Sequence, residues 1–308
     1  MPKCNKRKLP ITVQTQHEGP VSNARTPSKS DKSRKKAKRT LIIQEFHTLN
    51  KSLSSIRKEI EHLSRDSSKA NNKTIEQLKK SETRTLEKLN DLGGLDTYQK
   101  QSLRGQSKIS GGDTSRWLID LLFKLEILPL VNKNTKKLEL LEVGALSPLN
   151  YSKEFKWIKP TCIDLNSQHK LIIECDFLSV PLDTNVSKQF PCPFDIISLS
   201  LVVNFEGDIS KRGDMLIHAA KLLEPRSGLL FFVLPLPCIS NSRYFNENKL
   251  LEIISSLGMK CIAKHHSSKL AYYLFKVEKS FSVSEIKGKF PKILIGDGSK
   301  KNNFCIKI

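Results

Sequence analysis

Residues 138–145 constrain the fold of this chain more than any other stretch. They read Leu-Glu-Leu-Leu-Glu-Val-Gly-Ala, an apolar run that is typical of the first strand of a buried parallel sheet. Gly144 falls where the strand should turn into a loop, and a side chain there would block a ligand lying across the strand end. The next predicted strand, 160–164, closes on Asp164, twenty residues after the glycine. An acid at that distance is typical of one that binds ribose hydroxyls.

Predicted strands and helices alternate from residue 138 to about residue 280. This alternation is typical of a doubly wound, Rossmann-like α/β sheet, here one that finishes with a pair of strands. The predicted strands are 138–143, 160–164, 171–175, 194–198, 229–234, 259–263 and 271–277, and the predicted helices lie near 149–158, 215–223 and 248–257.

The same patterns divide the chain into four segments. We predict a disordered basic tail at 1–40, a helical extension with a glycine-rich loop at 41–130, the sheet domain at 131–280 and a C-terminal tail at 281–308. Apolar and basic residues alternate at the very end, 304–308, and the pattern does not place this stretch in the fold.

The distribution of charge predicts a polyanionic partner. The 308 residues carry a net charge of +21, with 52 Lys and Arg against 31 Asp and Glu. Two basic clusters, 6–8 and 34–39, lie in a segment too poor in apolar residues to form a core. They are typical of a nuclear or nucleolar address, an RNA-binding arm, or both. A solvated tail is the plainer alternative, but the uneven charge favours nucleic acid.

Other classes of protein are disfavoured by what the sequence lacks. No run is long and apolar enough to span a bilayer, and no secretory signal peptide is recognisable, so we expect no membrane partner. The seven cysteines are scattered, with no CxxC pair and no cysteine–histidine cluster. We therefore expect reduced thiols and no bound metal.

The segment before the sheet predicts two helices and an unusual loop. Apolar residues recur at helical spacing on both sides of a polar break at 65–73, so 41–91 should form a helical hairpin that packs on the main domain. Residues 93–116 then hold five glycines among aromatic and polar side chains. They fit a flexible linker or a lid over a substrate, and their side chains favour the lid. Ser115 is the predicted N-cap of a further helix.

Four predicted strand ends should meet at one edge of the sheet, where ligands bind in such folds. They are Gly144, Asp164, the pair Asp176 and Phe177, and the run 198–200. An acid after the third strand can accept a hydrogen bond from an adenine amino group, and the neighbouring backbone N–H can donate to a ring nitrogen. The row therefore fits a cofactor that contains adenosine.

The residues after Gly144 decide between two such cofactors. They read Ala-Leu-Ser-Pro, so the GxGxxG run that brings a pyrophosphate against a helix N-terminus is missing. S-adenosylmethionine has no phosphate and needs no such run. The sequence therefore favours S-adenosylmethionine over NAD.

The loops after the fourth and fifth strands predict the acceptor. Residues 198–205 lack the Asn/Asp-Pro-Pro-aromatic run of exocyclic-amine methyltransferases. A ring nitrogen with a free lone pair is the simplest remaining acceptor, because no proton has to leave before attack. In the overhanging loop 235–245, Arg243 could meet a phosphate and Tyr244 could stack a flipped base. Asn204 could orient the adenine edge. Packing of a proline-bounded loop is the structural alternative.

Several of these motifs together resemble those of the fungal large-subunit ribosomal RNA adenine-N1 methyltransferases of the Bmt2 type. The resemblance covers roughly residues 90–280 and implies a class I methyltransferase sheet. The matching motifs are Gly93-Gly94-Leu95 with Tyr98-Gln99, Ser102, Gly105-Gln106, 111–115, Leu141-Glu142-Val143-Gly144, Ile163-Asp164-Leu165, Asp176-Phe177-Leu178 and Asn241-Ser242-Arg243-Tyr244.

The resemblance implies a nucleolar enzyme that uses S-adenosylmethionine to form N1-methyladenosine in 25S ribosomal RNA. Its partner would be large-subunit ribosomal RNA or a pre-ribosomal particle. It implies cofactor contacts at Gly144 and Asp164. Distant animal relatives look like cofactor sensors, and the residues that touch cofactor in those correspond to Asp176, Phe177 and Ser200.

Two functions of different kinds remain open at this point. One is methyl transfer, with Asn204, Arg243 and Tyr244 as the catalytic candidates. The other is a non-catalytic S-adenosylmethionine-binding sensor or a ribosome-assembly factor. A sensor has no use for basic arms, so the charge of +21 favours the enzyme.

Overall fold

The computed structural model of the protein describes residues 29–65, 69–94, 97, 114–127, 136–167, 169–183, 187 and 189–308. The chain separates into two compact units, Met1–Arg39 and Thr40–Ile308. Of the first unit, residues 29–39 are described, and they form the beginning of helix α1. The sheet and the other described helices belong to the second unit.

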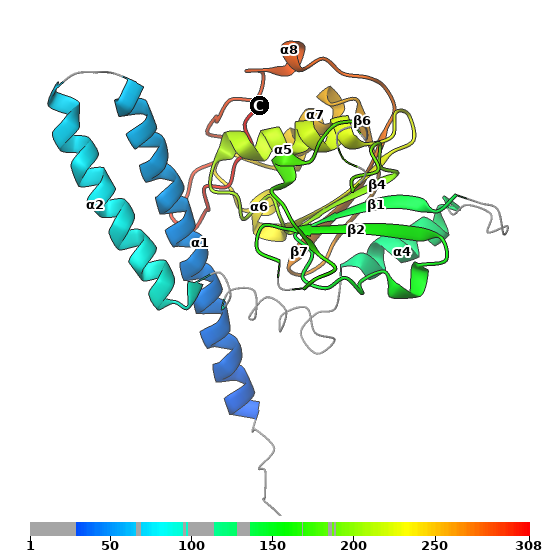
Figure 1. Ribbon diagram of the computed structural model, residues 1–308, viewed down its shortest axis with the longest axis horizontal. Helices are drawn as coiled ribbons and strands as arrows, with labels where there is room; N and C mark the ends of the chain where they lie inside the picture. Colours follow the sequence, from blue (N-terminus) through cyan, green and yellow to red (C-terminus); the bar gives the residue numbers. More distant parts are fainter. Residues whose placement is uncertain are drawn as a thin grey trace, which may run out of the picture. The chain divides into compact units, whose positions relative to one another are not determined.

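A seven-stranded sheet forms the centre of the second unit (Figure 1). Its order is β3-β2-β1-β4-β5-β7-β6, and β7 runs antiparallel to both of its neighbours while the other strands are parallel to one another. This topology confirms the predicted doubly wound sheet that ends in a strand pair. The strands are β1 (Leu138–Val143), β2 (Ile158–Asp164), β3 (Ile173–Glu174), β4 (Ile196–Ser200), β5 (Leu229–Pro235), β6 (Met259–His266) and β7 (Leu270–Val277).

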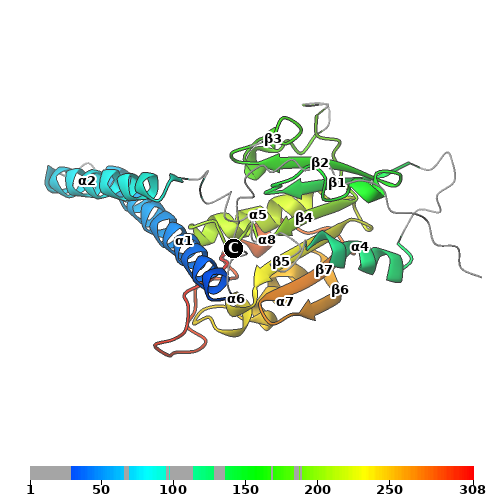
Figure 2. The ribbon, with the colours of Figure 1, turned by 90° about the horizontal axis from the view of Figure 1, so that it is seen from below.

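Helices cover both faces of the sheet (Figures 1 and 2). Leu216 of α5 and Ile254 of α7 pack in the core on one face, and Leu118 and Leu122 of α4 pack in the core on the other. The helices after the extension are α4 (Ser115–Lys124), α5 (Ile209–Leu222), α6 (Leu236–Ser240), α7 (Glu247–Ser256) and α8 (Val283–Ile286), with 3-10 turns η1 (Ser152–Glu154) and η2 (Phe177–Ser179).

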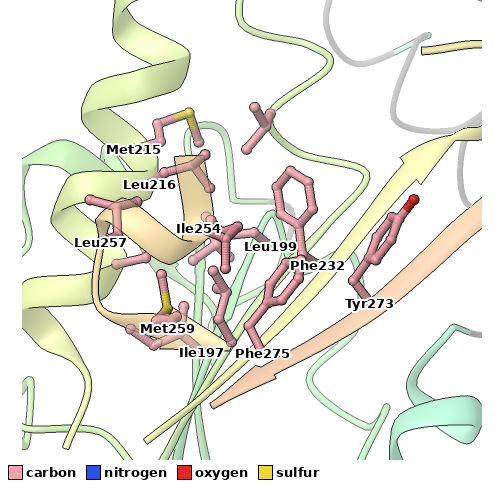
Figure 3. Close-up of a cluster of buried hydrophobic side chains, with 14 of the residues drawn as sticks. Ile197, Leu199, Met215, Leu216, Phe232, Ile254, Leu257, Met259, Tyr273 and Phe275 are labelled. Carbon is pink, nitrogen blue, oxygen red and sulfur yellow. The ribbon is translucent and has the colours of Figure 1, made fainter. Parts of the chain in front are cut away.

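Strand β5 is apolar throughout because both of its faces are buried. Successive side chains of a strand point to opposite faces, and Leu230 and Phe232 enter one core while Leu229 and Phe231 enter the other. Each buried Leu or Phe contributes about 1.5–3 kcal/mol relative to exposure. Figure 3 shows the larger core, in which Phe232 lies among Leu199 and Phe275 of neighbouring strands and residues of α5 and α7.

The two predicted helices of the extension are α1 (Lys29–Arg65) and α2 (Lys69–Asp91). They pack as a hairpin through the buried side chains of Phe46, Leu53 and Leu89, and the Arg57 Nε lies 2.7 Å from the Glu82 Oε1. Helix α1 begins earlier than predicted, so the basic cluster 34–39 lies on a helix rather than in a disordered tail. Lys, Arg and Ala are good helix formers, which accounts for the difference. The cluster at 6–8 lies outside the described residues.

The predicted helix at 149–158 is wrong. The segment between β1 and β2 holds only the short turn η1, and Tyr151 and Trp157 are buried beneath the sheet. A ten-residue helix advances about 15 Å, whereas the chain must return along six strand residues, about 20 Å. Turns and extended backbone cover that distance better than a helix.

The C-terminal segment, which the sequence pattern did not place, packs into the fold. Phe304, Cys305 and Ile306 are buried, and the Lys307 N–H donates to the Ile209 carbonyl at the start of α5 over 2.9 Å. A Cβ on Gly213 would lie 2.0 Å from the Lys307 carbonyl oxygen, so only glycine allows this approach. Helix α4 likewise packs on the sheet rather than with the extension. None of the described helices is long and apolar enough to cross a membrane.

Candidate active site

Gly144 directly follows β1 and has a left-handed backbone, φ +71°. A Cβ at this position would lie 3.0 Å from the Cγ2 of Val202, which follows β4. The next residue continues the pairing with β2, since the Ala145 N–H donates to the Ile163 carbonyl over 2.9 Å. The strand end is therefore bare backbone, as the sequence predicted, because both the conformation and the space require glycine.

Asp164 lies beside this turn, at the end of β2. Its Oδ1 accepts a hydrogen bond from the Asn166 N–H at 2.9 Å, and its side chain is half-buried. Its carbonyl accepts from the Cys175 N–H at 2.9 Å, which continues the pairing between β2 and β3. The register therefore brings the ends of β1, β2 and β3 together at one edge of the sheet.

Asp176 and Phe177 follow β3 and play different parts. The exposed Asp176 caps η2, with its Oδ1 accepting from the Leu178 N–H at 3.0 Å. The ring of Phe177 is 3% exposed and packs edge-on against His218 of α5, with 5.2 Å between centroids. Phe177 can therefore contact a ligand through its backbone N–H, which lies at the start of η2, but not through its buried ring.

Ser200 ends β4 and is joined to the start of α4. Its Oγ lies 2.8 Å from the Oγ1 of Thr114. Thr114, not the predicted Ser115, is the N-cap residue of α4, and its hydroxyl makes this long-range contact instead of capping the helix. Thr114, near the end of the glycine-rich stretch 93–116, is thus fixed at the same sheet edge. Of the predicted lid, residues 95–96 and 98–113 lie outside the described residues.

Glu142 is a site residue whose role the sequence did not reveal. It is 8% exposed, and its Oε1 accepts from the Asn150 Nδ2 at 2.6 Å. This bond fixes the loop that follows Gly144. Burial, followed by the nearby Glu142 charge, raises the pKa of the Cys162 thiol, which keeps that thiol protonated. A glutamate inside an apolar strand was the available signal, because a buried carboxylate must find donors.

The loop after β4 carries Asn204. It begins with Leu201 at φ +58°, a conformation that costs a non-glycine residue about 1–2 kcal/mol. Among the described residues, the Asn204 Oδ1 is buried and has no hydrogen-bond partner. Leaving a buried acceptor unpaired costs about 1–3 kcal/mol. Strain and an unpaired acceptor in one loop are typical of a functional site.

Arg212 holds this loop in place. It is 2% exposed; its Nε donates to the Glu206 carbonyl at 2.8 Å, and a terminal nitrogen donates to the Cys305 carbonyl at 2.7 Å. Burial lowers the pKa of the guanidinium, yet an arginine keeps its proton. Arg212 therefore ties the Asn204 loop to the C-terminal segment.

Helix α1 also contacts this loop. Lys58 forms an ion pair with Asp208, the N-cap residue of α5. Burial would raise the pKa of Asp208, but Lys58 and the Ser210 N–H together lower it. A Cβ on Gly207 would lie 2.8 Å from the Cβ of Ser54, so α1 approaches the loop closely.

Arg243 is placed differently from the prediction. Its guanidinium donates to the carbonyls of Lys301 and Gly298, both at 2.7 Å, and to the Asn303 Oδ1 at 2.8 Å. These bonds use the donors that a phosphate would need. Arg243 therefore holds the C-terminal segment, a role that no local pattern around residue 243 could indicate.

Tyr244 lies next to the same segment. The Lys292 Nζ is 4.3 Å from the centroid of its ring, and the side chain is half-buried. A cation above the ring covers one stacking face. The predicted stacking of a flipped base on Tyr244 stays a prediction.

Comparison with known proteins identifies the family. A sequence model described as Bmt2, 25S rRNA (adenine(2142)-N(1))-methyltransferase, matches residues 83–306. The chain belongs to the Bmt2 family. It is 37% identical over 217 residues to the Schizosaccharomyces pombe protein named 25S rRNA adenine-N(1) methyltransferase, which covers 69% of this chain and 76% of that protein. It is 35% identical over 228 residues to the Saccharomyces cerevisiae 25S rRNA (adenine(2142)-N(1))-methyltransferase, covering 72% of this chain and 62% of that protein.

The Bmt2 match extends further than the resemblance of 90–280. It begins within α2 and includes α4, the whole sheet and the buried residues 304–306. Helix α1 precedes the matched region. Among solved structures, the chain is also similar to the N-methyltransferase NodS from Bradyrhizobium japonicum, at 14% identity and a TM-score of 0.38 over 58% of this chain and 98% of that one.

Proposed function

We propose that this Bmt2-family protein transfers a methyl group from S-adenosylmethionine to N1 of an adenine in 25S ribosomal RNA. The observation that carries the proposal is a single sheet edge that combines a bare glycine turn, Asp164 and Asp176 with the unpaired side-chain oxygen Oδ1 of Asn204. The family membership and the names of its relatives support the choice of acceptor.

The cofactor residues have distinct tasks in this proposal. Gly144 lets the cofactor cross the end of β1, and the Asp164 carboxylate accepts from the ribose hydroxyls. Asp176 accepts from the adenine amino group, and the Phe177 N–H donates to a ring nitrogen. Ser200, joined to Thr114, borders the reacting end. No residue in this set needs to cradle a phosphate, which fits S-adenosylmethionine.

Methyl transfer to N1 requires the protein to orient the adenine but does not require a catalytic base. When bound, S-adenosylmethionine supplies a methyl carbon activated by its sulfonium. The N1 lone pair forms the new bond as the carbon–sulfur bond breaks, so no base has to act before attack. The Asn204 Oδ1 accepts from the adenine N6 amino group and aims N1 at the methyl group. Orientation then supplies most of the rate enhancement.

Deletion of the gene in its own organism tests the proposed function. N1-methyladenosine blocks the Watson–Crick edge and stops reverse transcriptase. Primer extension on 25S ribosomal RNA should lose one strong stop in the deletion strain and regain it when the wild-type gene is returned. An unchanged pattern of stops would exclude the enzyme and leave a cofactor sensor.

We further propose that the basic N-terminal unit delivers the protein to the nucleolus or to pre-ribosomal RNA. Removing residues 1–39, the unit that ends at Arg39, should reduce nucleolar localisation or lower the affinity for ribosomal RNA. It should not change S-adenosylmethionine binding, because the sheet edge lies in the other unit. Each lost phosphate contact should also reduce the slope of log Kd against log salt concentration by about 0.7–0.9. A truncated protein with wild-type localisation and salt slope would contradict the proposal.

A further inference from the structure

The C-terminal segment contains an exposed apolar run flanked by lysines. Ile293, Leu294 and Ile295 are 54%, 56% and 45% exposed, three in succession. Lysines bound this stretch at 292 and at 300–301, and we call residues 292–301 the lysine-flanked loop. Its single acid, Asp297, lies 3.4 Å from the Arg243 Nε. A folded protein rarely exposes such a run without a binding partner.

The lysine-flanked loop is held in one conformation by the domain beneath it. The Ile295 N–H donates to the Arg243 carbonyl at 2.8 Å, and the Arg243 guanidinium donates to the carbonyls of Gly298 and Lys301. Just before the loop, the Lys249 Nζ donates to the Pro291 carbonyl at 2.7 Å. The apolar side chains are therefore presented on an ordered support, which lowers the entropy cost of binding.

This loop lies at the sheet edge that carries the candidate site. Figures 1 and 2 both draw it, in red, beside α6, the helix that follows β5. The Asn302 Nδ2 donates to the Pro237 carbonyl of α6 at 2.7 Å. Strand β5 pairs with β4 up to Ser200, and Arg212 joins Cys305 to the loop that carries Asn204. The same edge thus holds the apolar run and the candidate acceptor loop.

We propose that the lysine-flanked loop binds ribosomal RNA next to the target adenine. This inference rests on the proposed function. N1 lies on the pairing edge, so the target adenine must be unpaired or flipped out before transfer. That leaves neighbouring bases unstacked, and apolar side chains can contact or wedge between such bases. Ile293, Leu294 and Ile295 supply this apolar surface, while Lys300 and Lys292 supply positive charge for the phosphates.

Two full-length variants test the proposal with unmodified 25S ribosomal RNA, transcribed in vitro, as the probe. The triple variant Ile293→Ser, Leu294→Ser and Ile295→Ser should weaken RNA binding about tenfold in filter-binding assays, a change of about 1.4 kcal/mol, because the apolar contacts with the bases are lost. The double variant Lys292→Ala and Lys300→Ala should reduce the slope of log Kd against log salt by roughly 1.4–1.8, because two phosphate contacts are lost. S-adenosylmethionine affinity should stay at the wild-type value in both.

A matched control is available at the opposite end of the sheet. Phe155 is 40% exposed between Lys153 and Lys156, just before β2. The variant Lys153→Ala, Phe155→Ser and Lys156→Ala removes the same kinds of side chain and should bind ribosomal RNA as the wild type does.

Three outcomes would overturn the proposal. The serine variant could bind the RNA with wild-type affinity, or the control variant could lose as much affinity as the loop variants. The wild type could also form a dimer in analytical ultracentrifugation that the serine variant abolishes, which would make a second copy of the chain the occupant. Methyl transfer measured on the same RNA separates the two claims. If the wild-type protein binds this RNA but transfers no methyl group to it, the proposed reaction is rejected while the loop's role in RNA binding is not.

Discussion

Replacing Gly144 with arginine is expected to abolish S-adenosylmethionine binding, so that titration calorimetry on the folded protein detects no heat of association. The backbone at Gly144 has φ +71°, and even a Cβ would lie 3.0 Å from Val202. An arginine side chain would extend into the space that the cofactor must cross at the end of β1. A milder change, Asp164→Ala, should lose about 1.5–3 kcal/mol of binding energy, the value of a hydrogen bond to a charged group.

Gly288 provides the control for backbone strain. It also has a left-handed backbone, φ +81°, but a Cβ there would meet nothing within 4 Å. Gly288→Arg therefore carries the same conformational cost of about 1–2 kcal/mol without filling a ligand site, and it should bind S-adenosylmethionine normally. Wild-type affinity in folded Gly144→Arg would show that the cofactor does not cross this turn.

Replacing Asn204 with leucine should lower methyl transfer about 100-fold while making the protein more stable. Leucine has a similar shape, and it removes a buried acceptor that has no partner among the described residues. Removing that acceptor should raise the free energy of unfolding by part of the roughly 1–3 kcal/mol that an unpaired buried group costs. Losing the hydrogen bond that orients the adenine should cost about 10²–10³ in rate, as for other groups that bind the reacting state. Methyl transfer to 25S ribosomal RNA, S-adenosylmethionine affinity and the thermal midpoint would be measured together.

Asn246 is the matched control for this substitution. It is half-buried like Asn204, but its side chain accepts from the Lys249 N–H at 2.9 Å as the N-cap of α7. Asn246→Leu should lower stability by about 0.5–2 kcal/mol and leave methyl transfer near the wild-type rate in the folded protein. If Asn204 had only a structural role, the Asn204→Leu variant would lose methyl transfer and stability together. That result would reject the role of Asn204 in orienting the adenine.

The sheet edge proposed to bind the cofactor could be predicted from sequence because each of its parts is local. Gly144 follows an apolar strand, Asp164 ends the next strand, and Asp176 caps the turn after the third. Strand alternation predicts the sheet, and a parallel sheet brings the carboxyl ends of its strands together. The position of these residues therefore follows from the order of elements alone. The helix expected at 149–158 was wrong because the local sequence pattern does not show the distance that the chain must span between β1 and β2.

Backbone geometry and the apolar period specify the doubly wound sheet, the glycine turn and the row of acids within a few residues, so these features can be predicted from the amino-acid sequence. The partners that surround the loop carrying Asn204 follow instead from how the whole chain packs. Arg243 donates to residues 298–303, Arg212 donates to the Cys305 carbonyl, and Thr114 bonds Ser200, each across more than fifty residues. A buried arginine takes whichever carbonyls the packed chain brings within reach. Those partners have no signature in the local sequence, because they exist only once the core has formed.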